Sequence, residues 1–396
     1  MATPAAAGSA TTAVAGAVLV LAAAVLCSSS VAGDDTELRA GGRIITRRHQ
    51  VVPAMYVFGD SLVDAGNNDF LPPPAPKAAP PNGVDLPRTI VWRTGRFTNG
   101  YNLADIIAQF VGLKKSPPAY LSVTPSSRLD MLLGRVGTNY ASGGSGILNA
   151  TGNGTITLFE QVQLFAKTKT TIIRAGLVGR ERLDDLLACS LFLISTGGND
   201  FTAFSYGGVP LTQAPEFIAG MVTDYLKYIN ELYKLGARRL ILLDILPVGC
   251  LPSQRATTAD GECNNDGNYL SKLFNSLLRV EMAQAVMASM PGMKYSIASL
   301  YNVFSDMIAN PTLAGLREVK RGCCGSGKFN GEADCTMETN LCTDRDEYLF
   351  WDKVHGTEAA YRRAVLSFFY GTMRDAEPVN LDRLLQEPYS TTTTPY

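Results

Sequence analysis

Five short, almost uninterrupted apolar runs constrain the fold of this chain more than any other feature. They cover residues 55–58, 137–141, 191–195, 240–246 and 295–298. Continuous rather than alternating apolar sequence is typical of strands that are covered on both faces of a parallel sheet. Segments with helical periodicity lie between and after these runs, at residues 101–112, 215–236, 268–290 and 357–371. The alternation predicts a doubly wound α/β fold with a mainly parallel, five-stranded sheet.

Both ends of the chain are predicted to lie outside this fold. Residues 13–26 form an apolar run of signal-peptide length, and Ser30 and Ala32 fit the small-residue pattern of a cleavage site, although no Lys or Arg precedes the run. The alternative is an uncleaved anchor. No later stretch is long and apolar enough to form a second membrane span. The chain therefore divides into a secretory signal, an N-terminal arm, one globular domain and a C-terminal tail, at residues 1–32, 33–50, 51–375 and 376–396.

The bulk composition excludes some partners. With 396 residues, of which 46% are hydrophobic, the chain can bury the core of one large domain. Its net charge of -1 gives no long-range attraction to nucleic acid or to anionic lipid. We therefore expect a secreted monomer with no nucleic-acid partner and no transmembrane anchor.

Secretion changes how the cysteines are interpreted, because thiols form disulfides in an oxidising compartment. Removal of the signal leaves seven cysteines, so one is expected to stay unpaired, and Cys189 beside an apolar run is the natural buried free thiol. Cys250 and Cys263 flank one loop and are expected to bridge. The pairing of the remaining four, which crowd a single loop, is left open: Cys323, Cys324, Cys335 and Cys342. Asn149 and Asn153 begin two glycosylation sequons.

Residues suited to acyl transfer follow several of the predicted strands. The first run ends in Gly59-Asp60-Ser61, the second is followed by a glycine-rich turn at residues 143–146, and the third by Asn199. Because ligands bind beyond the carboxyl ends of parallel strands, these residues are expected to converge. A serine in such a turn is more often only a helix cap or a turn former, so the rest of the chain has to decide its role.

The histidine count narrows the choice of a base. The chain has two histidines, His49 in the arm and His355. A serine nucleophile needs an adjacent base, which leaves His355 as the candidate. Asp352 lies three residues earlier and can hold the far ring nitrogen. The alternative is a surface histidine beside an unrelated aspartate, an arrangement that structural ion pairs also produce.

An oxyanion needs hydrogen-bond donors, and the strand ends supply three kinds. They are the amide of Ser61, the backbone of the glycine-rich turn and the side chain of Asn199, although each is also ordinary turn chemistry. No cofactor and no metal is expected, because a single useful histidine and oxidised cysteines leave few ligands. Residues 322–329 approach a phosphate-loop pattern, but Phe329 replaces the required Ser or Thr.

Six stretches together resemble the plant GDSL esterase/lipase family, part of the SGNH hydrolase group. In chain order they read FGDSLVDAGNN, GRFTNGYNLADIIAQ, NYASGGSGI, STGGNDF, GARRLILLDILPVGCLPS and YLFWDKVHGTEAAYR. The resemblance covers roughly residues 51–370. It implies a three-layer α/β/α, flavodoxin-like fold for the domain of residues 51–375, and ester hydrolysis by a Ser–His–Asp set.

The same resemblance assigns roles to individual residues. It implies a nucleophile, an Asp–His pair and an oxyanion asparagine at Ser61, Asp352, His355 and Asn199. The oxyanion glycine falls within the glycine-rich turn, where Gly146 is expected and Gly144 is the second choice. Gly356 departs from the pattern, because the family usually has proline after the histidine, and this could loosen the turn.

The expected function is that of a secreted serine ester hydrolase of the carboxylesterase or lipase type, working through an acyl-enzyme. Two alternatives use the same scaffold. An acyltransferase would pass the acyl group to a sugar or phenolic hydroxyl, and a non-catalytic secreted protein would only bind. The motifs leave the natural ester substrate, small or polymeric, undetermined.

Overall fold

The computed structural model describes residues 38–40, 43–45, 52–87 and 94–387. The predicted signal at residues 1–32 and His49 lie outside the described residues. Of the predicted arm at residues 33–50, only a short antiparallel hairpin is described, formed by β1 (Leu38–Ala40) and β2 (Arg43–Ile45).

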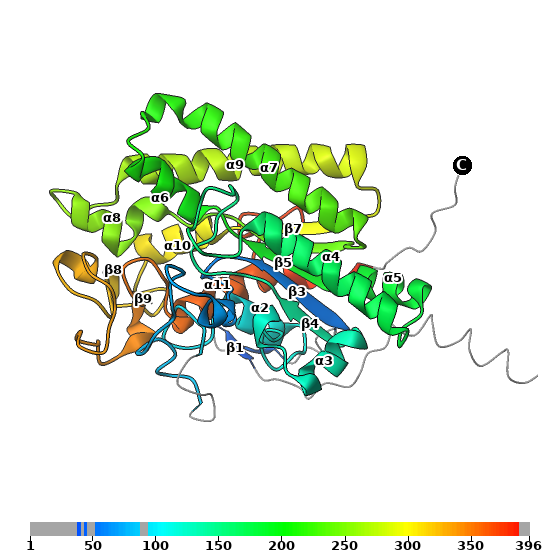
Figure 1. Ribbon diagram of the computed structural model, residues 1–396. Coiled ribbons are helices and arrows are strands. Elements are labelled where there is room, and N and C mark those ends of the chain that lie inside the picture. The colour runs from blue at the N-terminus through cyan, green and yellow to red at the C-terminus, as the bar shows by residue number, and fades with distance from the viewer. Residues whose placement is uncertain (1–37, 41–42, 46–51, 88–93, 388–396) are drawn as a thin grey trace, which may run out of the picture.

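A six-stranded sheet in the order β10-β7-β6-β5-β3-β4 forms the centre of the domain (Figure 1). The five predicted strands are confirmed and all run parallel: β3 (Ala54–Gly59), β4 (Val136–Asn139), β5 (Leu191–Ser195), β6 (Arg239–Leu243) and β7 (Lys294–Ala298). The sixth strand, β10 (Ala376–Glu377), was not predicted and pairs antiparallel with β7.

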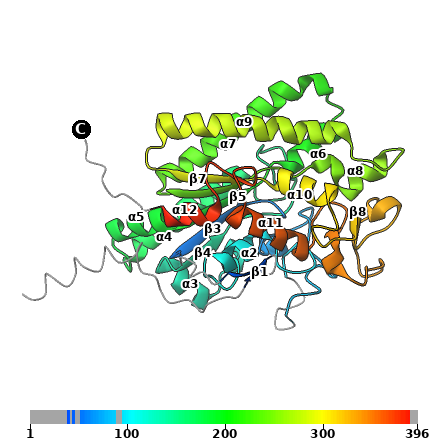
Figure 2. The same ribbon diagram turned by 180° about the vertical axis from the view of Figure 1, so that it is seen from behind.

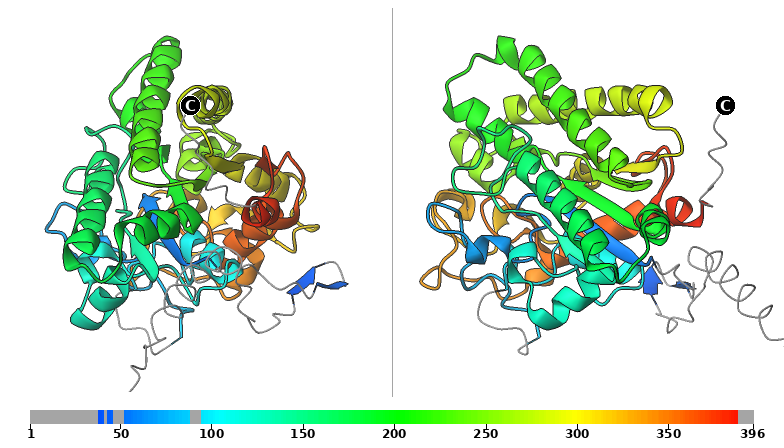
Figure 3. Two further views of the ribbon diagram at one scale, coloured as in Figure 1. Left: turned by 90° about the vertical axis from the view of Figure 1, so that its right-hand side faces the viewer. Right: turned by 45° about the vertical axis from the view of Figure 1, so that its right-hand side comes forward.

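Helices cover both faces of the sheet, which confirms the three-layer α/β fold. One face packs against α2 (Leu103–Phe110), α10 (Leu300–Ala309), α11 (Glu358–Tyr370) and α12 (Leu381–Gln386). The other packs against α4 (Leu158–Ala175), α5 (Arg180–Cys189), α7 (Ala214–Lys234) and α9 (Asn265–Ser289). Helices α4 and α7 lie in front of the sheet in Figure 1, and α11 and α12 in the reverse view of Figure 2. Figure 3 gives two intermediate views of the same layers.

The side chains of β3 explain why its sequence is continuously apolar. Met55 and Val57 belong to the core under α2 and α11, whereas Tyr56 and Phe58 belong to the core under α4 and α7. Successive residues of a strand point to opposite faces, so a strand between two helical layers must be apolar at every position.

Shorter elements connect these layers. They are α3 (Pro125–Leu132), α6 (Gly198–Tyr206), α8 (Pro252–Thr257) and a separate parallel pair formed by β8 (Glu318–Gly322) and β9 (Tyr348–Phe350). None of the helices within the described ranges is long and apolar enough to cross a membrane.

Polar residues fix the starts of the principal helices. The side chain of Asn102 accepts a hydrogen bond from the amide of Asp105 at the start of α2, and the Asp105 carboxylate accepts from the amide of Asn102. Thr357 caps α11 through the amide of Ala360. Each cap satisfies backbone donors that the first turn of a helix leaves unpaired.

The order of the parallel strands creates a site at one end of the sheet. The neighbouring strands β3 and β5 are followed by strands on opposite sides, β4 after β3 and β6 after β5, so the connections that leave them run in opposite directions. In doubly wound sheets the crevice beyond the carboxyl ends of two such strands is where ligands bind. In this chain those ends belong to β3 and β5.

The predicted tail at residues 376–396 begins too early. Residues 376–377 form β10, and Leu381, Leu384 and Leu385 of α12 are buried in the core. The segment was missed because a strand of two residues and a helix of six are too short to show a clear periodicity.

Three disulfides join described cysteines. The expected bridge between Cys250 and Cys263 is confirmed, and the crowded loop contains two bridges, Cys323–Cys342 and Cys324–Cys335. The expectation of a free thiol at Cys189 is wrong, because Cys189 is disulfide-bonded. The expectation had rested on the odd number of cysteines that remain after signal removal and on the apolar run beside Cys189.

The burial of α12 predicts that it is part of the cooperative fold. Leu384 is 0% exposed, so Leu384→Ala should lower the free energy of unfolding by about 2–5 kcal/mol through lost burial and the cavity left behind. Leu313→Ala is the matched control, because Leu313 is 90% exposed and its truncation should change stability by less than about 0.5 kcal/mol. Urea unfolding measures both, and equal effects would contradict the packing of α12.

Candidate active site

Three segments that are distant in sequence meet at the carboxyl ends of β3 and β5. Ser61 lies two residues beyond the end of β3, and Asn199 lies in the first turn of α6, which follows β5. Asp352 and His355 lie between β9 and the start of α11. The structure therefore brings together the four side chains that the sequence singled out.

Ser61, His355 and Asp352 form one hydrogen-bonded chain. The Oγ of Ser61 lies 2.8 Å from Nε2 of His355. On the far side of the ring, Nδ1 lies 2.8 Å from Oδ2 and 3.0 Å from Oδ1 of Asp352. A carboxylate can only accept, so Nδ1 carries the proton and Nε2 is free to accept from the serine hydroxyl. This is the arrangement in which a histidine can take a proton from serine.

Asp352 is held in its charged form. Its Oδ1 accepts hydrogen bonds of 2.8 Å from the amides of Val354 and His355. Burial alone would raise the pKa of Asp352, but the charge of His355 and the hydrogen bonds from His355 and Val354 together lower it below its ordinary value. A charged Asp352 can orient the imidazole and stabilise its protonated form.

The loop that follows His355 is fixed by its own contacts. The hydroxyl of Thr98 donates to the carbonyl of Gly356 at 2.8 Å, and the amide of Gly356 donates to the hydroxyl of Tyr361 at 2.9 Å. A proline at position 356 would have no N–H for the second bond. The glycine that departs from the family pattern therefore gains a tether that the proline lacks. Phe97 adds a ring contact to His355, with 5.6 Å between ring centroids.

Glycine at position 59 lets the chain leave the sheet just before Ser61. Its φ is +136°, which side chains disfavour, and a Cβ there would lie 1.9 Å from the carbonyl oxygen of Ser195. The backbone of β3 can therefore approach β5 closely, and the amide of Asp60 still donates to the carbonyl of Ser195 at 3.0 Å.

The turn that begins at Asp60 exposes one backbone donor. The carbonyl of Asp60 accepts from the amides of Val63 and Asp64, and its carboxylate accepts from the amide of Leu62. Among the described residues, the amide of Ser61 has no hydrogen-bond acceptor. It is therefore available to a negative charge that develops beside the serine hydroxyl.

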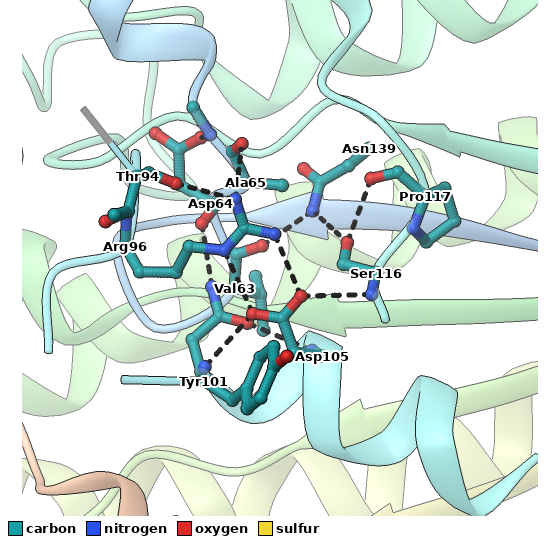
Figure 4. Close-up of polar contacts among 12 residues, drawn as sticks. Val63, Asp64, Ala65, Thr94, Arg96, Tyr101, Asp105, Ser116, Pro117 and Asn139 are labelled. Atoms are coloured by element: carbon teal, nitrogen blue, oxygen red, sulfur yellow. Dashed lines mark hydrogen bonds and ion pairs between the residues drawn. The ribbon is translucent and has the colours of Figure 1, made fainter. Parts of the chain in front are cut away.

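Side chains from three other segments hold the end of this turn (Figure 4). Asn139 donates to the carbonyl of Val63 at 2.7 Å, Asn102 to that of Asp64 at 2.7 Å, and Arg96 to that of Ala65 at 3.1 Å. Three consecutive carbonyl groups are thereby tied to the end of β4, to the start of α2 and to the segment before α2.

A buried ion pair orients Arg96 within this network (Figure 4). Nη2 and Nε of Arg96 lie 2.9 and 3.0 Å from the two carboxylate oxygens of Asp105. Burial alone would raise the pKa of Asp105, but the charge and hydrogen bonds of Arg96 lower it, so the carboxylate stays ionised. Such two-point pairing fixes the plane of the guanidinium as well as its position.

Asp64 connects the serine turn to the glycine-rich turn. Its carboxylate accepts from the amides of Gly66 at 2.7 Å, Asn67 at 2.9 Å and Gly143 at 3.0 Å. Burial raises the pKa of Asp64 to about 6, although these hydrogen bonds oppose the rise. The amide of Gly143 is therefore already engaged.

The direction of two peptide groups distinguishes the other glycines of this turn. The carbonyl of Ser145 accepts from Nδ2 of Asn199 at 2.9 Å. In a planar trans peptide the N–H points opposite to the C=O, so the amide of Gly146 points away from Asn199. The carbonyl of Gly143 faces Asn68 at 2.7 Å, so the amide of Gly144 points away from Asn68, and it has no acceptor among the described residues.

Gly146 has a packing role of its own. A Cβ at this position would lie 2.5 Å from both carboxylate oxygens of Asp200. That carboxylate accepts from the amides of Ile147 and Leu148 and from the hydroxyl of Thr151. Glycine thus allows Asp200, the neighbour of Asn199, to hold the chain that follows the turn.

The remaining predicted positions are surface features. The side chains of Asn149 and Asn153 are both exposed, in the loop before α4. Their glycosylation stays a prediction.

Within the described ranges, no three His, Cys, Asp or Glu side chains are grouped as metal ligands.

Several residues that support the site were not singled out from the sequence. Arg96, Asn102 and Asn139 lie inside stretches that carry the family resemblance, which was the available signal. Asp64 lies in such a stretch as well. Gln161, whose contacts are described below, lies outside all of them.

Comparison with known proteins identifies the family of this chain. The family model described as GDSL-like lipase/acylhydrolase matches residues 55–368. The chain belongs to this family. It is therefore a hydrolase of ester bonds, and the residues that the family resemblance assigned lie within the matched segment.

Two Arabidopsis thaliana proteins illustrate how far the similarity extends. GDSL esterase/lipase LTL1 is 37% identical over 338 residues, which cover 83% of this chain and 89% of the relative. GDSL esterase/lipase At4g28780 is 35% identical over 341 residues, covering 84% and 90%. The similarity thus extends over more than four fifths of this chain and of each relative.

The ion pair behind the serine turn should dominate local stability in this GDSL hydrolase. Asp105→Asn leaves the buried guanidinium of Arg96 without its charge partner and should lower the free energy of unfolding by about 3–5 kcal/mol. Asp224→Asn is the matched control, because the Asp224–Lys227 pair is exposed and contributes at most about 1 kcal/mol. Urea unfolding compares them, and similar losses would show that the buried pair is not needed.

Proposed function

We propose that this GDSL hydrolase is a secreted serine esterase that cleaves its substrate through an acyl-enzyme. The observation that carries the proposal is the 2.8 Å hydrogen bond between Ser61 Oγ and His355 Nε2, with Asp352 on the other ring nitrogen. Three disulfides between described cysteines and two exposed sequons support secretion.

The reaction proceeds in two halves. Ser61 Oγ attacks the ester carbonyl while its proton passes to Nε2 of His355, and Asp352 stabilises the imidazolium that forms. The tetrahedral intermediate collapses, the ester C–O bond breaks, and His355 returns the proton to the leaving alcohol. Water then attacks the acyl-enzyme with His355 again as base, which releases the acid and restores the Ser61 hydroxyl.

Three donors are proposed for the oxyanion: the amide of Ser61, the amide of Gly144 and the second N–H of Asn199. Gly144 is preferred to Gly146, which the family resemblance favoured, because the amide of Gly146 points away from Asn199. The amide group of Asn199 has two N–H bonds, and the carbonyl of Ser145 uses one of them. The other can face the substrate.

The nucleophile is tested directly by covalent labelling. A fluorophosphonate probe should label the wild-type protein, and Ser61→Ala should abolish the labelling together with esterase activity. Product analysis with an added sugar or phenol separates hydrolysis from acyl transfer. Persistent labelling of the Ser61→Ala protein would contradict the assignment.

Asn199→Ala tests the oxyanion role. The variant should fold normally and lose about 10²–10³-fold in kcat, because one donor to the developing charge is removed. Steady-state hydrolysis of a p-nitrophenyl ester measures the loss, and thermal unfolding checks the fold. Asn310→Ala, at an exposed asparagine, is the control and should behave as wild type. A near-normal rate in Asn199→Ala would remove Asn199 from the site.

The pH dependence tests His355 as the base. Activity should fall on acidification, because a protonated Nε2 cannot accept the proton of Ser61. Asp352 stays charged, since its pKa is lowered, but burial raises the pKa of Asp60 to about 7, so Asp60 is also protonated as the pH falls.

Asp60→Asn separates these two contributions. It removes the titrating carboxyl and keeps an oxygen for the amide of Leu62, so a decline caused by His355 should persist in the variant. Initial rates of the wild type and of Asp60→Asn, measured between about pH 5 and 8, show whether the decline persists in the variant. A profile that is flat between about pH 5 and 8 would argue against His355 as the base.

A further inference from the structure

Both the oxygen and the nitrogen of the Gln161 side-chain amide form hydrogen bonds with the backbone of one residue, Gly59. Gln161 lies in the first turns of α4 and is 0% exposed. Its Oε1 accepts from the amide of Gly59 at 2.7 Å, and its Nε2 donates to the carbonyl of Gly59 at 2.9 Å. Gly59 lies only two residues before Ser61.

The acceptor that Gln161 offers to the amide of Gly59 replaces a missing strand partner, whereas the carbonyl of Gly59 also accepts from the amide of Ser142 at 2.9 Å. On the other edge of β3, Gly59 pairs with Ser195 of β5, but the last residue of β4 in the ladder is Asn139, which pairs with Val57. At Gly59 the sheet therefore has no strand to accept its amide on that side. A buried N–H without a partner costs about 1–3 kcal/mol, and Gln161 supplies the acceptor.

The same side chain also contacts the glycine-rich turn at residues 143–146, called the oxyanion turn below because it carries the proposed donor Gly144. Nε2 of Gln161 lies 3.3 Å from Oγ of Ser145 and 2.9 Å from the carbonyl of Ile156, which follows the turn. Ser145 Oγ donates to the carbonyl of Gly59 at 2.9 Å. Gln161, Ser145 and Gly59 thus form a closed set of hydrogen bonds between the two turns.

Ser145 extends this set to the oxyanion asparagine. Its side chain contacts Gly59, and its main-chain carbonyl accepts from Nδ2 of Asn199 at 2.9 Å. A displacement of Ser145 would therefore move Asn199 relative to Ser61. The bonds that fix Ser145 indirectly fix the distance between the nucleophile and one oxyanion donor.

We propose that Gln161, acting with Ser145, is a positioning residue that sets the serine turn against the oxyanion turn. The proposal rests on the proposed function, since it assumes that Ser61 and Asn199 act on the same substrate carbonyl. Gln161 does not touch the reacting atoms. It acts only by positioning Gly59 and Ser145. Its effect is therefore expected in the geometry of the transition state rather than in substrate binding.

Gln161→Leu tests the proposal by removing every polar contact while keeping an apolar side chain of similar size. Misplacement by about 1 Å can cost about 100-fold in rate, so kcat should fall by roughly 10–100-fold with little change in KM. Rates are measured with a p-nitrophenyl ester well below the unfolding temperature and divided by the number of sites titrated with a fluorophosphonate. Gln163→Leu is the matched control on the exposed face of the same helix and should retain the wild-type kcat.

A second variant decides the question if Gln161→Leu fails to fold. Ser145→Ala removes the hydroxyl that donates to Gly59 but keeps the carbonyl that holds Asn199, and it should also lower kcat more than it raises KM. Where both single variants fold, the losses in the double variant should be less than additive, because the two residues act as one unit.

The outcomes separate this proposal from the one on which it rests. If the probe does not label the wild type, the proposed function fails. If it labels the wild type and Gln161→Leu keeps the wild-type kcat per titrated site, with only a lower unfolding temperature, Gln161 is merely structural and the proposal is overturned. A wild-type kcat in a folded Ser145→Ala protein would overturn the role of Ser145 in the same way.

Discussion

The close approach of Gly59 to Ser195 determines where the rest of the site can lie. It joins the last residue of β3 to the last residue of β5 at a distance that excludes any side chain on position 59. Ser61 therefore emerges at the boundary between two strands whose connections run in opposite directions. The segments that carry Asn199 and His355 complete the site by lying beside the carboxyl ends of these two strands.

The turn that carries Ser61 is held by polar side chains in addition to the hydrophobic core, which buries Val63. Gln161 satisfies the backbone on one side of it, and Arg96, Asn102 and Asn139 satisfy three carbonyl groups on the other. Buried polar groups are costly unless they are paired, so such a network permits few alternative positions. A catalytic turn needs this restriction, because apolar packing alone tolerates small shifts that hydrogen-bond geometry does not.

The sequence predicted the features that leave a local or repeated signal. The five parallel strands were found because burial on both faces makes each of them continuously apolar. Ser61, Asp352, His355 and Asn199 were singled out because they lie in recognisable stretches, and their catalytic roles stay a prediction. Features that depend on distant contacts were not found. Gln161 pairs with a residue 102 positions away, and the choice between Gly144 and Gly146 depends on the direction of single peptide groups. The bond at Cys189 was missed because an apolar neighbouring sequence does not show whether a cysteine is bonded.

The two-residue strand β10 has a consequence for how copies of this protein meet. It pairs with Ile297 and Ala298, two of the five residues of β7, which is the strand at the end of the parallel series. An uncovered strand edge presents free N–H and C=O groups to any other chain and is a common starting point for aggregation. By pairing with Ile297 and Ala298, β10 leaves fewer of these groups exposed, so removal of residues 376–377 is expected to increase association of copies through β7.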